Sequence, residues 1–369
     1  MQHPDICNPC QITFGATSFA KTAGLIDGQR YGVVTYPEPY FAGLVTRLSA
    51  DAGPPVLVIG DVAPNPDFAR LTRQAAGISD QPEVFVALGG GSVIDTAKVL
   101  ASANGDFARV KAFLTTKSGE DALSATPIIA VPTTAGTGSE VTCWATVWDN
   151  KAKQKHSLNR PELYPEHAVV DPTLMLGKSR DLTISTGLDA LSHALESLWN
   201  INATAGSASH AVKAASLIMA TLPKLLTDLG SLKLRTDMAL ASLNAGLAFS
   251  QTKTAIAHSV SYPISLNNGV VHGIACSFTL PMVLQVMAQD TGPCGQALKQ
   301  IFGADLTKAP KIMQDFLASV GVSSRPVDHG VSAEMWRVYV DAAFGGERGR
   351  NFVGSRDAFH RAAATLGLV

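Results

Sequence analysis

The feature that most constrains the fold is a change of pattern near residue 182. Before it, short runs rich in β-branched residues alternate with amphipathic stretches of helical spacing, which is typical of an α/β domain with a parallel sheet. After it, helical spacing continues and strand candidates are few. We therefore expect an α/β domain over residues 1–181 and an all-helical domain over residues 182–369. The strand candidates are RYGVVTY (30–36), PPVLVIG (54–60), EVFVALGG (83–90) and PIIAVPTT (127–134).

The length and composition of the chain favour an enzyme with two domains. A chain of 369 residues is too long for one ordinary core, and an apolar content of 46% argues against disorder. The net charge of −1 gives no electrostatic case for a nucleic acid or a membrane surface as partner. No apolar run approaches the roughly 20 residues of a spanning helix, and the N-terminus lacks a signal-peptide pattern. We therefore expect a cytoplasmic protein.

The cysteines give little support for a thiolate metal site. Cys7 and Cys10 form a single C-x-x-C motif, which could be half of a zinc site or a redox pair. No second C-x-x-C motif exists in the sequence. Because the cytosol is reducing, we interpret the two residues as reduced cysteines of a terminal segment.

Two glycine-rich loops follow strand candidates of the first domain. They are GGGSVID (89–95) and PTTAGTGSEV (132–141). Glycine permits close approach of the backbone, and a helix N-terminus offers N–H groups to an anion. The first loop is neither G-x-G-x-x-G nor a Walker loop, and a glycine-rich turn alone is usually only a turn. Two such loops at the carboxyl ends of neighbouring parallel strands would line one crevice, so together they predict a dinucleotide site.

Ionisable side chains stand among the apolar residues of the second domain. Asp189 and His193 are four residues apart on one helix face, surrounded by leucine and alanine. His258 and His272 lie in two further apolar stretches. A lone histidine of this kind is usually a satisfied core residue, but a buried charge is costly unless it is paired or binds a metal. One carboxylate and three imidazoles suit Fe(II) or Zn(II). The absence of thiolates from this group argues against a closed structural zinc site.

Four segments together resemble the iron-containing (group III) alcohol dehydrogenase family: GGGSVID, PTTAGTGSE, STGLDALSHALES and AHSVSYPISLNNGVVHG. The resemblance runs from about ITFG (12–15) to near the C-terminus, and the spacing from His258 to His272 matches the family pattern. It implies the dehydroquinate synthase-like, iron-alcohol-dehydrogenase fold, with a dinucleotide-binding α/β domain and an all-α metal domain. It also implies Fe²⁺ (or Zn²⁺) and NAD(H) or NADP(H) as cofactors, and a homodimer.

The resemblance also implies roles for individual residues. Metal ligation falls on the four residues Asp189, His193, His258 and His272, and catalysis on Tyr262 and His272. Many members have a histidine, a candidate proton carrier, at the position of Tyr262; water chains through the cofactor ribose are the alternative proton route. The implied cofactor contacts are Asn65, Gly90, Gly91, Ser92, Asp95, Thr133, Thr134, Thr142 and Lys155.

A second departure from the family pattern concerns the cofactor. Many members have an acidic residue after the first strand, where it holds the ribose hydroxyls of the adenosine. This chain has Tyr36 there. Because no carboxylate repels a 2′-phosphate, NADPH is not excluded.

Two segments resemble a narrower branch of the family, the phosphonoacetaldehyde reductases of phosphonate metabolism: KQKHSLNRPELYPEHAVVDP and AHSVSYPISL with HGIACSFTLP. The implied reaction is reduction of phosphonoacetaldehyde to 2-hydroxyethylphosphonate. Because the substrate is an anion, the site needs cations. Arg348 and Arg350 are favoured since their glycine-rich loop can fold over a cleft. The other candidates are Lys155, His156, Arg160 and Lys253.

Other functions remain open at this point. The enzyme could instead be a general short-chain alcohol dehydrogenase or a reductase of another anionic carbonyl compound such as maleylacetate. A lyase of the sugar-phosphate cyclase type would use NAD without net redox. A metal-binding relic without catalysis is disfavoured because both glycine loops and all four ligand positions are present.

Overall fold

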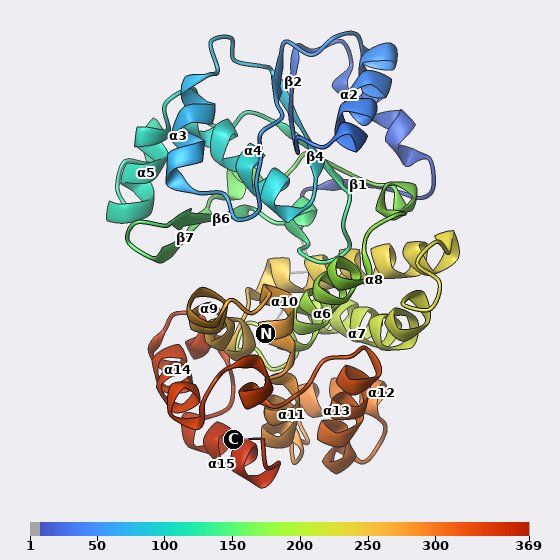
Figure 1. The fold of residues 1–369 in the computed structure, drawn as a ribbon, viewed down its shortest axis with the longest axis vertical. Coiled ribbons are helices and arrows are strands. Elements are labelled where there is room, and N and C mark those ends of the chain that lie inside the picture. Colours follow the sequence, from blue (N-terminus) through green and yellow to red (C-terminus); the bar gives the residue numbers. More distant parts are fainter. Residues whose placement is uncertain (1–7, 369) are drawn as a thin grey trace. The chain divides into compact units, whose positions relative to one another are not determined.

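The structure is a computed structural model that describes residues 8–368, so that Cys7 lies outside the described residues. The chain forms two compact units (Figure 1). Residues 8–134 and 139–175 form an α/β unit, and residues 135–138 and 176–368 form a helical unit. The expected fold class, an α/β part followed by a helical part, is confirmed. The domain boundary that we predict after residue 181 falls in the first turn of the helix Arg180–Glu196.

The α/β unit is built on a six-stranded parallel sheet with the strand order β1-β8-β5-β4-β2-β3. All four strand candidates form part of this sheet. The strands β2, β4 and β5 are buried along their whole length, as expected for parallel strands that helices cover on both faces. The strands are β1 (Gln11–Phe14), β2 (Tyr31–Thr35), β3 (Leu57–Ile59), β4 (Val84–Gly89), β5 (Ile128–Pro132) and β8 (His167–Val170), and a separate hairpin comprises β6 (Trp144–Asp149) and β7 (Gln154–Asn159).

Two apolar cores flank this sheet because successive side chains of a strand point to opposite faces. On one face, Phe85 and Ala87 pack with the helices α3, α4 and α5. On the other, Val86 and Leu88 pack with α1 and α2. The helices are α1 (Thr22–Ile26), α2 (Pro39–Ala52), α3 (Phe68–Ala76), α4 (Gly91–Ala103) and α5 (Phe107–Thr116).

The helical unit is organised around α6 (Arg180–Glu196), whose apolar residues from Ile184 onward are buried on all sides. Ser179 caps its N-terminus by accepting a hydrogen bond from Leu182 N. None of the helices in the described part of the chain has the length and apolar character needed to cross a membrane. The others are α7 (Ala205–Leu225), α8 (Leu232–Thr252), α9 (Ile256–Asn268), α10 (His272–Ser277), α11 (Leu280–Met287), α12 (Pro293–Phe302), α13 (Ala309–Ser319), α14 (Ala333–Gly345) and α15 (Arg356–Thr365).

Candidate active site

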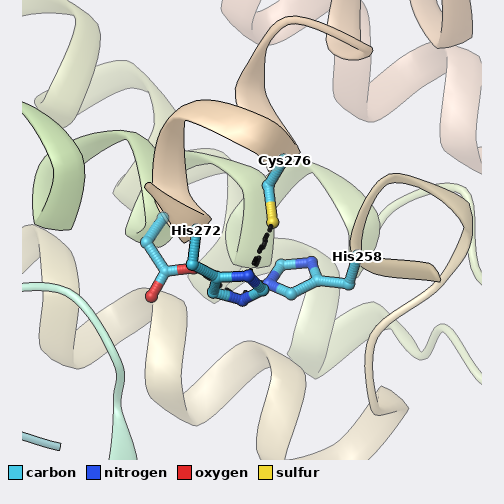
Figure 2. A group of neighbouring side chains, drawn as sticks. His258, His272 and Cys276 are labelled. Atoms are coloured by element: carbon cyan, nitrogen blue, oxygen red, sulfur yellow. Dashed lines mark hydrogen bonds and ion pairs between the residues drawn. The ribbon is translucent and has the colours of Figure 1, made fainter. Parts of the chain in front are cut away.

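Ligand atoms from three helices of the helical unit converge in its interior. Asp189 of α6, His258 of α9, and His272 and Cys276 of α10 each place one such atom within 4.8 Å of the others. Figure 2 shows His258 pointing toward His272 and Cys276, which come from the same short helix. The Sγ of Cys276 lies 3.8 Å from Nε2 of His272. The sequence predicted three of these four residues; Cys276 was not among the predicted ligands.

Close packing of α10 on α6 brings His272 to Asp189. Gly273 follows His272, and a Cβ atom added there would lie 1.9 Å from the carbonyl oxygen of Ser185. It would also lie 3.1 Å from Cβ of Asp189. Any side chain at residue 273 would therefore push the two helices apart.

One oxygen of Asp189 faces three imidazole nitrogens. Its Oδ1 lies 3.4 Å from Nε2 of His258 and 3.9 Å from Nε2 of both His193 and His272. Oδ1 and the Nε2 of His258 are buried and lack a hydrogen-bond partner of good geometry. Burying polar atoms without partners costs free energy. A cation among these atoms would remove that cost, so the residues present fit a divalent metal ion.

His193 is placed beside this group by stacking. Its ring stacks on Phe249 and on His258, with centroid distances of 4.1 Å and 4.5 Å. Burial lowers the pKa of His193 to about 4, although Asp189 acts in the opposite direction. Burial raises the pKa of Asp189, but the neighbouring His193 and the other imidazoles outweigh it, and the net pKa lies below its usual range. A neutral imidazole and an ionised carboxylate are the protonation states that ligate metals.

A buried carboxylate that we did not predict, Glu196, holds His258 from the other side of the ring. Glu196 is the last residue of α6 and is fully buried. Its Oε2 accepts a hydrogen bond of 2.6 Å from Nδ1 of His258. A sequence signal for it existed, because Asp189, His193 and Glu196 follow the i, i+4, i+7 spacing of one helix face.

Two further candidate residues lie next to His272. The ring of Tyr262 stacks parallel to that of His272, with a centroid distance of 5.8 Å. The guanidinium carbon of Arg348 lies 5.3 Å from the centroid of the Tyr262 ring, and its Nη1 donates a hydrogen bond of 2.8 Å to Oγ1 of Thr254. Arg350 is exposed and donates to the carbonyl oxygen of Gly345. The structure therefore brings Tyr262 and Arg348 together, and Arg350 faces solvent.

In the α/β unit, the two glycine-rich loops leave the same edge of the sheet. The strands β4 and β5 are paired, with Gly89 opposite Pro132. The N–H of Thr133 donates to the carbonyl oxygen of Gly89. A Cβ atom on Gly90 would lie 3.1 Å from Oγ1 of Thr134, so the loops touch at this point. This adjacency matches the crevice expected for a dinucleotide.

Other predicted cofactor residues surround the start of α4. Gly90 is the N-cap of this helix, which begins at Gly91 and Ser92. The backbone N–H of Asn65 donates to Oγ of Ser92 at 3.2 Å. Burial raises the pKa of Tyr36 to about 12, while a hydrogen bond with Ser92 lowers it. Residues after three different strands thus gather at one helix N-terminus, where an anion such as a pyrophosphate is stabilised.

Three predicted cofactor residues are engaged within the protein. The carboxylate of Asp95 accepts from Oγ of Ser139 at 2.5 Å and from the N–H of Thr146 at 2.8 Å. Thr142 is fully buried, and its Oγ1 accepts from Lys98 at 3.3 Å. Lys155 of β7 lies over the ring of Trp148. A direct contact of these residues with the cofactor stays a prediction.

The other predicted cations have structural partners. Arg160 is buried and donates to the carbonyl oxygen of Ser124 at 2.6 Å. His156 stacks on Phe68, with a centroid distance of 5.3 Å. Lys253 is exposed, and its ammonium lies 3.8 Å from the carboxylate of Glu347.

Cys10 is not an exposed residue of a terminal tail. Cys10 is buried, and its thiol donates to the carbonyl oxygen of Glu140 at 3.5 Å. Burial raises the pKa of this thiol to about 12, so it is protonated at neutral pH. Its partner in the C-x-x-C motif, Cys7, lies outside the described residues.

A parallel sheet with two glycine-rich loops at one edge and a helical unit with an aspartate–histidine cluster define a metal- and nicotinamide-dependent dehydrogenase. Residues 9–172 match the family described as iron-containing alcohol dehydrogenase. Residues 183–354 match the C-terminal part of the Fe-containing alcohol dehydrogenase family. The chain therefore belongs to the iron-containing alcohol dehydrogenase family. This confirms the expected enzyme class, an oxidoreductase with iron and a nicotinamide dinucleotide as cofactors.

Individual relatives include reductases of small aldehydes. The chain is 33% identical to a phosphonoacetaldehyde reductase of Streptomyces viridochromogenes over 85% of this chain and 87% of that protein. It is 34% identical to an NAD-dependent methanol dehydrogenase of Bacillus methanolicus over 65% of this chain and 62% of that protein. A sulfoacetaldehyde reductase from Bifidobacterium kashiwanohense, solved in complex with NAD+, superimposes with a TM-score of 0.89 at 28% identity, covering 100% and 99% of the two chains.

Proposed function

We propose that the enzyme reduces a small aldehyde that carries an anionic group, and that its substrate is phosphonoacetaldehyde. Two similar proteins are named for two-carbon aldehydes that bear a phosphonate or a sulfonate. The observation that carries the proposal is the position of Arg348, half-buried against Tyr262, which in turn stacks on His272. A guanidinium forms strong bidentate hydrogen bonds with such oxyanions.

In this proposal, the metal would be held by Asp189, His193, His258 and His272. A divalent metal bound there would supply Lewis acidity toward a carbonyl group, and a bound nicotinamide would supply the hydride. One carboxylate and three neutral imidazoles leave the site with a net positive charge. Adding the thiolate of Cys276 would cancel that charge and weaken the stabilisation of a developing oxyanion. We therefore assign His193 rather than Cys276 as the fourth ligand.

The chain's own residues would orient the substrate and supply the proton. Tyr262 is the proposed donor of the proton that the carbonyl oxygen gains as the aldehyde becomes an alcohol, because it stacks on His272 and a tyrosine hydroxyl can both donate and accept. Arg348 would hold the anionic group and so fix the direction in which the carbonyl points. In the α/β unit, Gly90, Gly91 and Ser92 would bind the pyrophosphate at the start of α4. The other proposed cofactor contacts are Asn65, Asp95, Thr133, Thr134, Thr142 and Lys155.

The position of Tyr36 suggests how the cofactor is selected. Its side chain approaches Gly90 and Ser92 at the candidate cofactor site and carries no negative charge at neutral pH. We therefore propose that NADPH is accepted as well as NADH. We further propose that the protein is cytoplasmic. We also propose that it forms a homodimer, and sedimentation of the purified enzyme would test this oligomeric state.

A panel of substrates tests the proposed function directly. We expect kcat/KM for phosphonoacetaldehyde to exceed that for propanal and for maleylacetate, with either reduced cofactor. A higher kcat/KM for propanal would contradict the anionic substrate and indicate a general alcohol dehydrogenase. Loss of the reduced nicotinamide absorbance in proportion to product would exclude a lyase without net redox.

A further inference from the structure

Glu196 is a buried carboxylate that four N–H groups satisfy. Its Oε1 accepts from the backbone N–H of Ala257 at 2.5 Å and of His258 at 3.3 Å. Its Oε2 accepts from the backbone N–H of Ala255 at 2.9 Å and from Nδ1 of His258 at 2.6 Å. Ionisation in a buried position is costly without such bonds. Four donors around one carboxylate favour its charged form.

These bonds fix two properties of His258. The three backbone donors belong to the first turn of α9, whose N-cap residue Ala255 offers no side-chain cap, so Glu196 holds the start of this helix from α6. The fourth bond fixes the ring. A carboxylate can only accept, so Nδ1 of His258 must carry the proton. The lone pair of a neutral ring is then on Nε2, which lies 3.4 Å from Oδ1 of Asp189.

While the ring is neutral, two acceptors face each other at this distance, which is repulsive unless a cation lies with them. The neutral ring and the carboxylate of Asp189 therefore suit a metal ion between them. A carboxylate that orients a metal-binding histidine through its second nitrogen also raises the basicity of that ligand.

We propose that Glu196 is a positioning residue that presets the tautomer and orientation of His258 for metal binding. This inference rests on the metal centre of the proposed function, but not on the identity of the substrate. Glu196 touches neither substrate nor cofactor in this assignment, and it acts through His258.

The substitution E196Q separates this role from simple helix capping. A glutamine amide must place its NH₂ group against one of the two pairs of donors. If the NH₂ group faces the backbone N–H groups of Ala257 and His258, it opposes two backbone donors. If the NH₂ group instead faces Ala255 N–H and the His258 ring, it opposes only one backbone donor. The His258 ring can then accept the second N–H of the amide on Nδ1, provided that the ring proton moves to Nε2. This second state costs less and removes the lone pair that would bind the metal.

The test measures zinc affinity by competition with a chromophoric chelator, and the His258 tautomer by ¹⁵N NMR of histidine-labelled protein. We expect the proton on Nδ1 in the wild-type enzyme, with or without zinc. We expect E196Q to bind zinc about 10- to 100-fold more weakly and, without zinc, to carry the proton on Nε2. E196D keeps a carboxylate and should keep the Nδ1 proton.

Asn351→Ala is the matched control for capping. Asn351 is buried and donates to the carbonyl oxygen of Thr254, directly before Ala255, so its loss loosens the same turn without touching the His258 ring. We expect the control to lower the melting temperature while leaving zinc affinity unchanged. Equal losses of affinity in E196Q and Asn351→Ala would reduce Glu196 to a cap and overturn the proposal.

Three other outcomes are equally decisive. A His258 ring protonated on Nε2 and not on Nδ1 in the zinc-free wild-type enzyme overturns the proposal without any variant, even if E196Q does not fold. His258→Gln identifies the ring signals and tests the metal centre itself. If His258→Gln loses zinc while E196Q keeps both its affinity and its Nδ1 proton, only the role of Glu196 fails. If His258→Gln leaves zinc affinity unchanged, the assigned metal centre fails, whatever the substrate panel shows.

Discussion

At the residue scale, the environment of each ligand atom decides its chemistry. The Oδ1 atom of Asp189 lies in an apolar helix and faces three imidazoles. The same carboxylate on a surface helix would form an ordinary ion pair with His193, of little energetic value. Burial converts this pair into a group that needs a cation, because buried polar atoms without a partner cost free energy.

The choice between His193 and Cys276 as fourth ligand can be tested with cobalt. In the cobalt(II)-substituted enzyme we expect no thiolate-to-metal charge-transfer band, and Cys276→Ala should bind the metal as tightly as wild type. His193→Ala should bind it at least about 10-fold more weakly, the loss typical of removing even an indirect partner. A strong charge-transfer band that disappears in Cys276→Ala would instead place the thiolate on the metal.

Tyr262 can be tested as the proton donor. Tyr262→Phe keeps the ring that stacks on His272 and removes only the hydroxyl. We expect turnover to fall by about 100-fold or more, the usual contribution of a general acid, with metal affinity unchanged. The pH dependence of kcat tests the same role of Tyr262, because the fall of kcat at high pH should be absent in the variant. An unchanged profile and rate would assign proton delivery to water.

At the element scale, short segments deliver the functional groups by close packing. The helix α10 can approach α6 only because Gly273 has no side chain. The loop between β5 and β6 uses the same device within the helical unit, where a Cβ atom on Gly138 would lie 2.6 Å from Cα of Gly246. Gly138 also has a φ of +60°, which favours glycine.

Gly273→Ala should therefore damage the metal centre without altering a ligand. A Cβ atom 1.9 Å from the Ser185 carbonyl forces α10 away from α6, so we expect zinc affinity to fall by about 10-fold or more. Gly345→Ala is the control, because nothing lies within 4 Å of its added Cβ. Equal zinc affinity in both variants, measured by chelator competition, would show that α10 can shift freely.

The proposed recognition of the substrate anion by Arg348, in the turn after α14, can be tested by substitution. Arg348→Met keeps apolar contact with Tyr262 and removes the charge. A lost charged hydrogen bond of about 1.5–3 kcal/mol corresponds to a KM for phosphonoacetaldehyde raised by about 10- to 150-fold. The KM for propanal should not change. Arg350→Met, on the same turn but exposed, is the matched control and should leave both KM values unchanged. Equal effects of Arg348→Met on both aldehydes would contradict anion binding by Arg348.

At the scale of the whole molecule, the two units have separate apolar cores and different buried charges. The helical unit buries Asp189 and Glu196 near histidines. The α/β unit buries Lys98 and Glu140 instead. The ammonium of Lys98 donates to the carbonyl oxygens of Ser139 and Trp144 and so holds the second glycine-rich loop to α4.

The stability of the α/β unit should depend on pH through Glu140. Burial raises the pKa of Glu140 from 4.5 to about 7. Since the folded state binds the proton more tightly than the unfolded state, this contribution is fully present below pH 4.5 and is lost as pH rises through about 7. We expect E140Q to be stabilised relative to wild type as pH increases over this range, by about 1.4 kcal/mol per pKa unit.

Calorimetry of both proteins across this pH range would measure that difference. The transition of the helical unit should respond equally in the two proteins. A constant difference in the free energy of unfolding at all pH values would show that Glu140 keeps its usual pKa in the folded state.

Local sequence patterns predicted the elements and most of the candidate centre. The alternation of strand and helix patterns depends on residues near each other in the chain, so it survives without tertiary information. The same holds for Asp189 and His193, whose shared helix face follows from their spacing. Glu196 satisfies the same spacing and could have been recognised from it.

Only the tertiary structure decided which side chains meet and which atoms they present. The bond between His258 and Glu196 joins residues 62 positions apart, and no local pattern encodes it. Packing likewise turned Asp95 and Thr142 toward Ser139 and Lys98, and brought Cys276 to His272. The sequence by itself determined the fold class, the family and the ligand-bearing helices, because these follow from local spacing and motifs. The contacts among those helices depend on how they pack, and packing is a property of the whole chain.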